Sequence, residues 1–107
     1  MTINKISDGS ALTVQLGGRM DAVTALEFDK SLKLDGVTDL IIDLADLEYI
    51  SSAGLRTLLK MQKKMDRQGS MKIRNVRENV REVLDMTGFS NFLTIDENKK
   101  SKFSVSF

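Results

Sequence analysis

Two adjacent serines stand between an apolar run and a stretch with helical spacing. The run Leu40-Ile41-Ile42 is typical of a buried strand, and Ser51 and Ser52 are followed by the small pair Ala53-Gly54. A hydroxyl at the start of a helix lies beside backbone N–H groups that lack intrahelical partners, where the helix dipole favours negative charge. The spacing therefore predicts either a site that holds a phosphate or a helix cap with no further role.

The residues around the two hydroxyls are open to both interpretations. Ser52 is a residue type that often caps a helix, and Ser51 is a second candidate for a cap or a loop hydroxyl. Gly54 in a first helical turn costs about 1 kcal/mol of helix propensity, so something requires a residue without a side chain there. Close approach by a partner protein is one explanation, and tight packing on the sheet is the other.

The composition is that of an ordinary globular domain. Of the 107 residues, 41% are hydrophobic and 29% are charged, which is enough apolar material for one core without disulfides. The net charge of +1 gives no strong field for nucleic acid or an anionic membrane. The sequence shows no signal peptide and no run near the ~20 apolar residues of a membrane helix. We therefore expect no direct nucleic-acid binding, no membrane insertion and a cytoplasmic location.

The residue types argue against an enzyme. The chain has no Cys and no His, which removes the thiolate and imidazole ligands of most metal sites and the Ser-His and Cys-His nucleophile pairs. It also lacks a Gly-rich phosphate loop of the G-x-x-x-x-G-K type. Asp43 and Asp46 have no evident third ligand, so we interpret them as a strand-end residue and a turn residue. We expect no catalytic residue, no metal and no cofactor.

The apolar periods predict an α/β domain with a mixed central sheet of four to five strands and helices packed on it. An initial hairpin turns at Asp8-Gly9, and Asp21 is placed to cap the first helix. The elements expected after residue 10 are a strand at 11–16 that Gly17-Gly18 ends, a helix from Asp21 to about Leu32 with Val23, Leu26 and Phe28 at helical spacing, a strand at 38–44, a helix at 52–67, a strand at 71–76, a helix at 78–86, a helical turn at Phe89 and Phe92, and a strand at 93–95.

The same periods predict the core and the solvated surface. The basic residues of the second helix, from Arg56 to Arg67, are spread without aromatic partners, so we interpret them as a solvated face. Residues 97–107 form either a tail or an extra edge strand. The predicted core comprises Leu16, Leu40, Ile42, Leu44, Leu55, Leu59, Ile73 and Leu84, together with Met61, Met65 and Met86.

Three short motifs resemble the STAS domain, and more narrowly the bacterial anti-sigma factor antagonists (anti-anti-sigma factors). They are Gly18-Arg19-Met20-Asp21, the stretch from Leu47 to Leu55, and Asp85-Met86-Thr87-Gly88-Phe89, in this order and spacing. The resemblance covers residues 2–96, so we divide the chain into a STAS domain at 1–96 and a segment at 97–107. It implies a small sheet of four or five strands with helices packed on it.

The resemblance also implies a switch without catalytic activity of its own. The unphosphorylated protein would bind an anti-sigma factor that is also a serine kinase, and so release a sigma factor. Phosphorylation of one serine at the start of the second helix would weaken this complex, and a metal-dependent serine/threonine phosphatase would reverse it. Aligning on Gly54-Leu55 places the phosphate at Ser52. Ser51, which stands where many members have Asp, is the alternative acceptor.

The resemblance further implies the partner-binding residues Asp21, Ser51, Ser52, Ala53, Gly54 and Arg56. We expect the free protein to be a monomer. Another class of STAS domain gives the alternative function, a subunit of a membrane transport complex that assembles without phosphorylation. Exposure to ATP and a cognate kinase would separate the two.

Overall fold

The computed structural model of the chain describes residues 1–96, and the predicted tail or edge strand at 97–107 lies outside them. One sheet has the strand order β1-β2-β3-β4-β5, in which β1 is antiparallel to β2 and the other neighbours are parallel. This confirms the predicted α/β domain with a mixed sheet. The elements are β1 (Thr2–Asp8), β2 (Ala11–Met20), α1 (Ala22–Ser31), β3 (Asp39–Ile50), α2 (Ser52–Gln68), β4 (Ser70–Arg74), α3 (Glu78–Thr87), the 3₁₀ turn η1 (Phe89–Asn91) and β5 (Ile95–Asp96).

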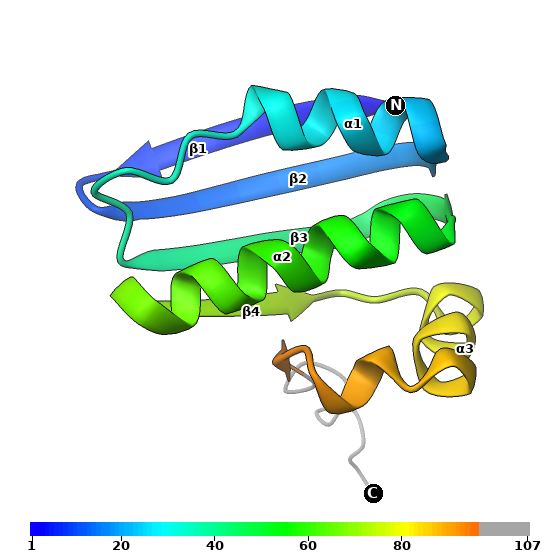
Figure 1. Cartoon of the computed structure of the whole chain (residues 1–107). Coiled ribbons are helices and arrows are strands. Elements are labelled where there is room, and N and C mark those ends of the chain that lie inside the picture. The colour runs from blue at the N-terminus through cyan, green and yellow to red at the C-terminus, as the bar shows by residue number, and fades with distance from the viewer. Residues whose placement is uncertain (97–107) are drawn as a thin grey trace, which may run out of the picture.

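Helices α1 and α2 lie side by side across one face of the sheet, as Figure 1 shows. Both helices begin at the end of the molecule where β2 and β3 finish. Helix α3 follows β4 near that same end and is tied to the second half of β3: Arg77 Nε donates to the carbonyl of Ala45, and Asn79 Nδ2 to that of Glu48, each at 2.8 Å. The carboxyl ends of the central strands are therefore the place where the helix starts gather.

The first turn of the chain confirms the predicted hairpin. Gly9, between β1 and β2, has φ +63°, a backbone conformation that residues other than glycine rarely adopt. The prediction that Gly17-Gly18 ends the second strand is wrong. The strand continues to Met20, because two register shifts against β3, at Gln15/Gly17 and at Gly18/Arg19, accommodate the glycines as irregularities within the strand.

Strand β3 is also longer than predicted, since it runs on from residue 44 to Ile50. Asp43 and Asp46 therefore lie within a strand, and the prediction of a strand-end and a turn residue is wrong. Asp43 is buried within this longer strand. Its carboxylate accepts hydrogen bonds from the backbone N–H of Ala45 at 3.0 Å and from Nδ2 of Asn75 at 3.1 Å, and it faces Nε of Arg74 at 3.4 Å.

The core lies between the sheet and its helices. All of the predicted core leucines and isoleucines are buried except Leu59, which is partly buried on the outer side of α2. Met61 and Met65 are buried as expected, but Met86 is 85% exposed, so its placement in the core is wrong. Helix α3 is only ten residues long, and it turns Val80 and Leu84 inward, which leaves the position two after Leu84 outside. The last strand begins at Ile95, later than the predicted residue 93.

Candidate functional site

The candidate site lies where β2 and β3 end side by side. Met20 and Ile50 are partners in the parallel register, and Asp21 and Ser51 are the residues that follow them. The backbone N–H of Ser51 donates to the carbonyl of Met20 at 2.8 Å, so the ladder extends one step beyond the strands. The structure thus brings Asp21 together with the two serines at the carboxyl ends of β2 and β3.

Asp21 is the N-cap of α1, in agreement with the prediction. Its Oδ1 accepts from the backbone N–H groups of Val23 at 3.0 Å and Thr24 at 2.9 Å, and Thr24 Oγ1 accepts from the N–H of Asp21 at 2.8 Å. This reciprocal pair is a capping box. The hydrogen bonds from Thr24, first from its backbone and then from its side chain, hold the pKa of the Asp21 carboxyl below its usual value. An ionised carboxylate is therefore fixed beside the serines.

The two serines have different roles in the fold. Ser51 is the N-cap of α2, and its Oγ accepts from the backbone N–H of Gly54 at 3.2 Å. Ser52 is the first residue of the helix and is exposed. Within residues 1–96 the Ser52 hydroxyl has no hydrogen-bond partner. The interpretation of Ser52 as the helix cap is wrong, because Ser51 already occupies that position with extended backbone angles, φ −90° and ψ 172°.

Gly54 is explained by packing on the sheet. A Cβ at this position would lie 2.8 Å from both Cγ1 of Ile50 and Sδ of Met20. These two side chains are the paired ends of β3 and β2, and both are buried. Of the two explanations that the sequence left open, tight packing on the sheet is therefore sufficient, and it places the first turn of α2 directly on the strand ends.

The other two predicted partner-binding residues of α2, Ala53 and Arg56, differ in their exposure to solvent. Ala53 is half-buried, and its carbonyl accepts from Thr57 Oγ1 at 3.0 Å. Arg56 is exposed and lies one helical turn after Ser52, so the two side chains share a face of α2. A cation thus stands close to the free hydroxyl.

Sequence reasoning missed two apolar side chains beside the site. Val23 and Leu26 follow Asp21 on α1 and are 66% and 55% exposed. Their spacing, together with that of Phe28, correctly predicted a helix, but it did not predict which face is buried. Ala25 and Phe28 are the buried residues of this helix. The signal was present in the positions Ala25, Phe28 and Leu32, which are three and four residues apart and mark the true core face.

The sequence also did not predict a cation–π contact near the ends of β2 and β3. Arg19 and Tyr49 are partners across β2 and β3, and the Arg19 guanidinium carbon lies 4.3 Å from the centroid of the Tyr49 ring. This pair joins β2 and β3 immediately before Met20 and Ile50. Within residues 1–96 there is no group of three or more potential metal-ligating acidic side chains, and no helix there is long and apolar enough to cross a membrane.

Comparisons with known proteins agree with this fold. The pattern of the STAS domain family matches residues 2–101. BtrV of Bordetella bronchiseptica, named as a candidate anti-sigma factor antagonist, is 31% identical over 105 residues, which are 94% of this chain and 89% of BtrV. The anti-sigma-B factor antagonist of Staphylococcus epidermidis is 25% identical over 101 residues, covering 91% of this chain and 94% of that protein.

Solved structures show the same fold at lower identity. The anti-sigma factor antagonist SpoIIAA in its unphosphorylated form has a TM-score of 0.75 at 15% identity, with 94% of this chain and 92% of that chain covered. An anti-sigma factor antagonist from Mycobacterium paratuberculosis has a TM-score of 0.80 at 20% identity, with 96% and 91% covered. The Bacillus protein SpoIIAA has also been solved in a phosphorylated form, with a TM-score of 0.69 at 14% identity and 98% and 100% coverage. The chain belongs to the STAS domain family, and the curated relatives it matches are anti-sigma factor antagonists.

Proposed function

We propose that the protein is a phosphorylation-controlled anti-sigma factor antagonist. Its unphosphorylated form binds an anti-sigma factor with serine kinase activity and so releases a sigma factor. Phosphorylation of Ser52 by that kinase ends the interaction, and a metal-dependent serine/threonine phosphatase restores it. The names of the curated relatives support the binding role, and the free, exposed hydroxyl of Ser52 is the observation that supports the position of the switch.

The choice between the two serines follows from their hydrogen bonds. A kinase must reach a hydroxyl and place it in line with a phosphoryl group. Ser51 is half-buried, and its oxygen is the acceptor that satisfies the N–H of Gly54. Transfer to Ser51 would require this cap to open, at a cost of about 0.5–2 kcal/mol. Ser52 is exposed and needs no such opening, so we assign the phosphate to Ser52.

The local electrostatics allow the fold to accept the modification. A phosphate adds about −1.5 to −2 charge at neutral pH. At the first residue of α2 it meets the positive end of the helix dipole, which stabilises a negative charge by about 0.3–1 kcal/mol. Arg56, one turn further along, offers a second favourable charge. The carboxylate of Asp21 opposes these terms from the start of α1, so the sum is small and the domain keeps its structure.

The partner surface is the exposed group formed by Asp21, Val23 and Leu26 of α1 with Ser52 and Arg56 of α2. Val23 and Leu26 provide the apolar area that the centre of a protein interface needs, and Asp21 and Arg56 provide charges for orientation. Ser51, Ala53 and Gly54 shape this surface from below. A phosphate buried here without a cationic partner from the anti-sigma factor costs several kcal/mol. Each 1.4 kcal/mol is a factor of ten in affinity.

The test begins with the partner and ends with calorimetry. The tagged protein is incubated with ATP in lysate of its source organism, and mass spectrometry identifies both the bound kinase and the phosphorylated residue. The purified kinase is then titrated with wild type, Ser52→Ala and Ser52→Asp. We expect phosphate on Ser52 in wild type and in Ser51→Ala, equal affinity for wild type and Ser52→Ala, and at least about tenfold weaker binding for Ser52→Asp.

A control variant tests whether weaker binding depends on where the negative charge is placed or only on the added charge. Ser7→Asp places the same carboxylate on exposed β1, away from the helix starts, and should bind the kinase as wild type does. Phosphate on Ser51 alone, or equal affinities for Ser52→Asp and wild type, would contradict the proposal. Capture of a membrane transporter with no phosphate on the chain would support a transport-complex subunit instead.

A further inference from the structure

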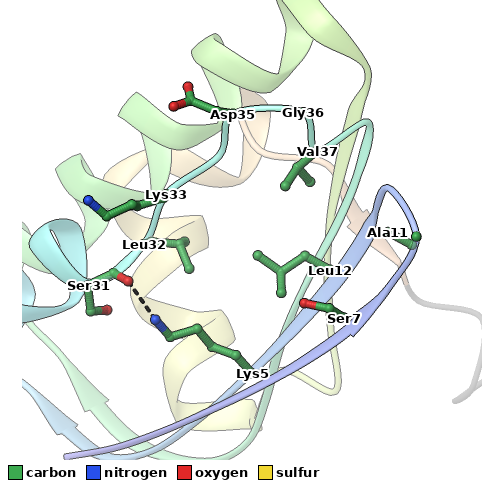
Figure 2. Close-up of a pocket in the computed structure, with 11 residues that line it drawn as sticks. Lys5, Ser7, Ala11, Leu12, Ser31, Leu32, Lys33, Asp35, Gly36 and Val37 are labelled. Atoms are coloured by element: carbon green, nitrogen blue, oxygen red, sulfur yellow. Dashed lines mark hydrogen bonds between the residues drawn. The ribbon is translucent and has the colours of Figure 1, made fainter.

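A cavity lies at the opposite end of the molecule from the serines. It is formed between the β1–β2 hairpin and the segment at 31–37 that links α1 to β3, and its volume is about 430 Å³. Ligand pockets in proteins have volumes of about 300–1,000 Å³. Figure 2 shows its lining residues, among them side chains of the hairpin that face side chains of the linking segment. The cavity is large enough for a small organic molecule.

The inner wall of this cavity is apolar. The side chains of Leu12, Leu32 and Val37 converge on one space in Figure 2, with the hydroxyl of Ser7 at its lower side. Leu12 and Leu32 come from two different chain segments and are among the buried core residues. The floor is therefore a rigid part of the fold, able to cover the apolar body of a ligand without rearrangement.

One cation stands at the edge of the cavity without a counter-ion. The Lys5 ammonium donates to the backbone carbonyl of Ser31 at 2.6 Å. In the described part of the chain no carboxylate pairs with Lys5. An ammonium has three donors, and the carbonyl uses one. In Figure 2 the charged ends of Lys33 and Asp35 point away from Leu12, so Lys5 is the charge that a bound molecule would meet.

We infer that this cavity binds a small organic anion, a carboxylate attached to an apolar body. The carboxylate accepts from the free donors of Lys5 in a charge-assisted hydrogen bond, which is roughly twice as strong as a neutral one. The apolar body covers Leu12, Leu32 and Val37. A neutral molecule of the same shape gains only the second contribution, and an inorganic anion gains only the first.

The protein has a second basic surface, which provides the control. A groove of about 580 Å³ runs along α2 and is lined by Leu59 and five cationic side chains. They are Arg56, Lys60, Lys63, Lys64 and Arg67. Its walls come from one helix, whereas the cavity at Lys5 lies between two chain segments and has a leucine floor. An organic anion that only follows positive charge would choose this groove instead.

The experiment is an amide NMR titration of the full chain with naphthalene-2-carboxylate and with its neutral analogue naphthalene-2-carboxamide. We expect saturable shifts for the acid at residues 7–12 and 31–37, with at least fivefold weaker binding of the amide. Lys5→Gln, a change at an exposed position, should weaken the acid at least fivefold and leave the amide unchanged. Ser7→Leu should weaken both ligands, because the Ser7 side chain faces the cavity and the added carbons would occupy it.

Lys63→Gln is the matched control, since it removes one cation from the groove on α2 and none from the cavity. It should bind the acid as wild type does. Melting temperatures of the variants show whether each one is folded. Shifts confined to residues 56–67, equal affinity for acid and amide, wild-type affinity in Lys5→Gln, or no saturable shift at all would each overturn the inference.

Discussion

A Cβ atom on Gly54 would lie 2.8 Å from Sδ of Met20, a side chain with no exposed surface. The first turn of α2 thus lies directly against the ends of β2 and β3, next to the two serines. Cγ1 of Ile50 lies equally near on the other side. Because Gly54 has no side chain, the start of α2, and with it Ser52, can lie close to the strand ends.

Gly54→Ala should destabilise the protein. Alanine gains about 1 kcal/mol in helix propensity over glycine, whereas overpacking a filled core costs about 1–3 kcal/mol. Because Met20 and Ile50 are both buried, we expect the steric cost to exceed the gain and the net loss to be about 1 kcal/mol. Urea unfolding measures it. In a Met20→Ala background the same change should cost less, and an equal cost in both backgrounds would show that Met20 is not the contact that matters.

The two serines should respond differently to alanine. Ser51→Ala removes the acceptor for the N–H of Gly54 and should cost about 0.5–2 kcal/mol. Ser52→Ala removes an exposed hydroxyl without a partner in the described residues and should stay within about 0.5 kcal/mol of wild type. Urea melts of both variants decide the matter. The reverse order of stabilities would mean that Ser52 is the cap in solution.

Asp21 should make stability depend on pH. Its pKa is lowered in the folded protein from the ordinary value of 3.8, so its contribution to stability is fully present above pH 3.8. The contribution is lost as the pH falls from 3.8 through the lower folded pKa, where the folded state also takes up the proton. Asn can still cap the helix, so Asp21→Asn isolates the charge. Its melting temperature should be below that of wild type at pH 7 and should approach it at pH 2; a difference that does not change with pH would contradict this assignment.

Leu55 should be a major core residue of α2. It is 1% exposed, and replacing a buried leucine with alanine typically costs about 2–5 kcal/mol. Leu26→Ala is the matched control, because Leu26 is also a helical leucine but is 55% exposed. It should cost less than about 1 kcal/mol. Denaturant melts compare the two, and a loss below about half a kilocalorie for Leu55→Ala would show that the register of α2 in solution differs from this structure.

The sequence was sufficient for the order of the elements because local signals agree with the global fold. Asp21 before α1, Gly69 after α2 and Gly88 after α3 stand at helix ends, and strand alternation marks β2 and β4. It was insufficient for the lengths of β2 and β3. Glycines that usually end strands are held at register shifts here, and Asp43 is satisfied by Asn75, which lies 32 residues away. Such distant partners leave no local pattern.

The candidate site was predictable in part. The serines and Asp21 could be placed at helix starts because hydroxyls and carboxylates there satisfy backbone N–H groups. Which serine caps α2 depends on where extended backbone gives way to helix, and that boundary is fixed by the hydrogen bond from Ser51 to Met20 across the sheet. The exposure of Val23 and Leu26 likewise depends on which side of α1 meets the sheet.

The central position of β3 has a consequence for the order in which the protein opens. This strand has 12 residues, and its first part, residues 39–43, pairs with β2 on one side and with β4 on the other. The amides of residues 39–43 can therefore exchange with solvent only when a neighbouring strand separates. Amide exchange should therefore be slowest at residues 40–42 and fastest along β1 and β5 at the two edges. Ser52 stands two residues beyond the end of this slowest-opening strand. A modification of Ser52 therefore changes the surface of the protein while the most stable part of the sheet stays folded.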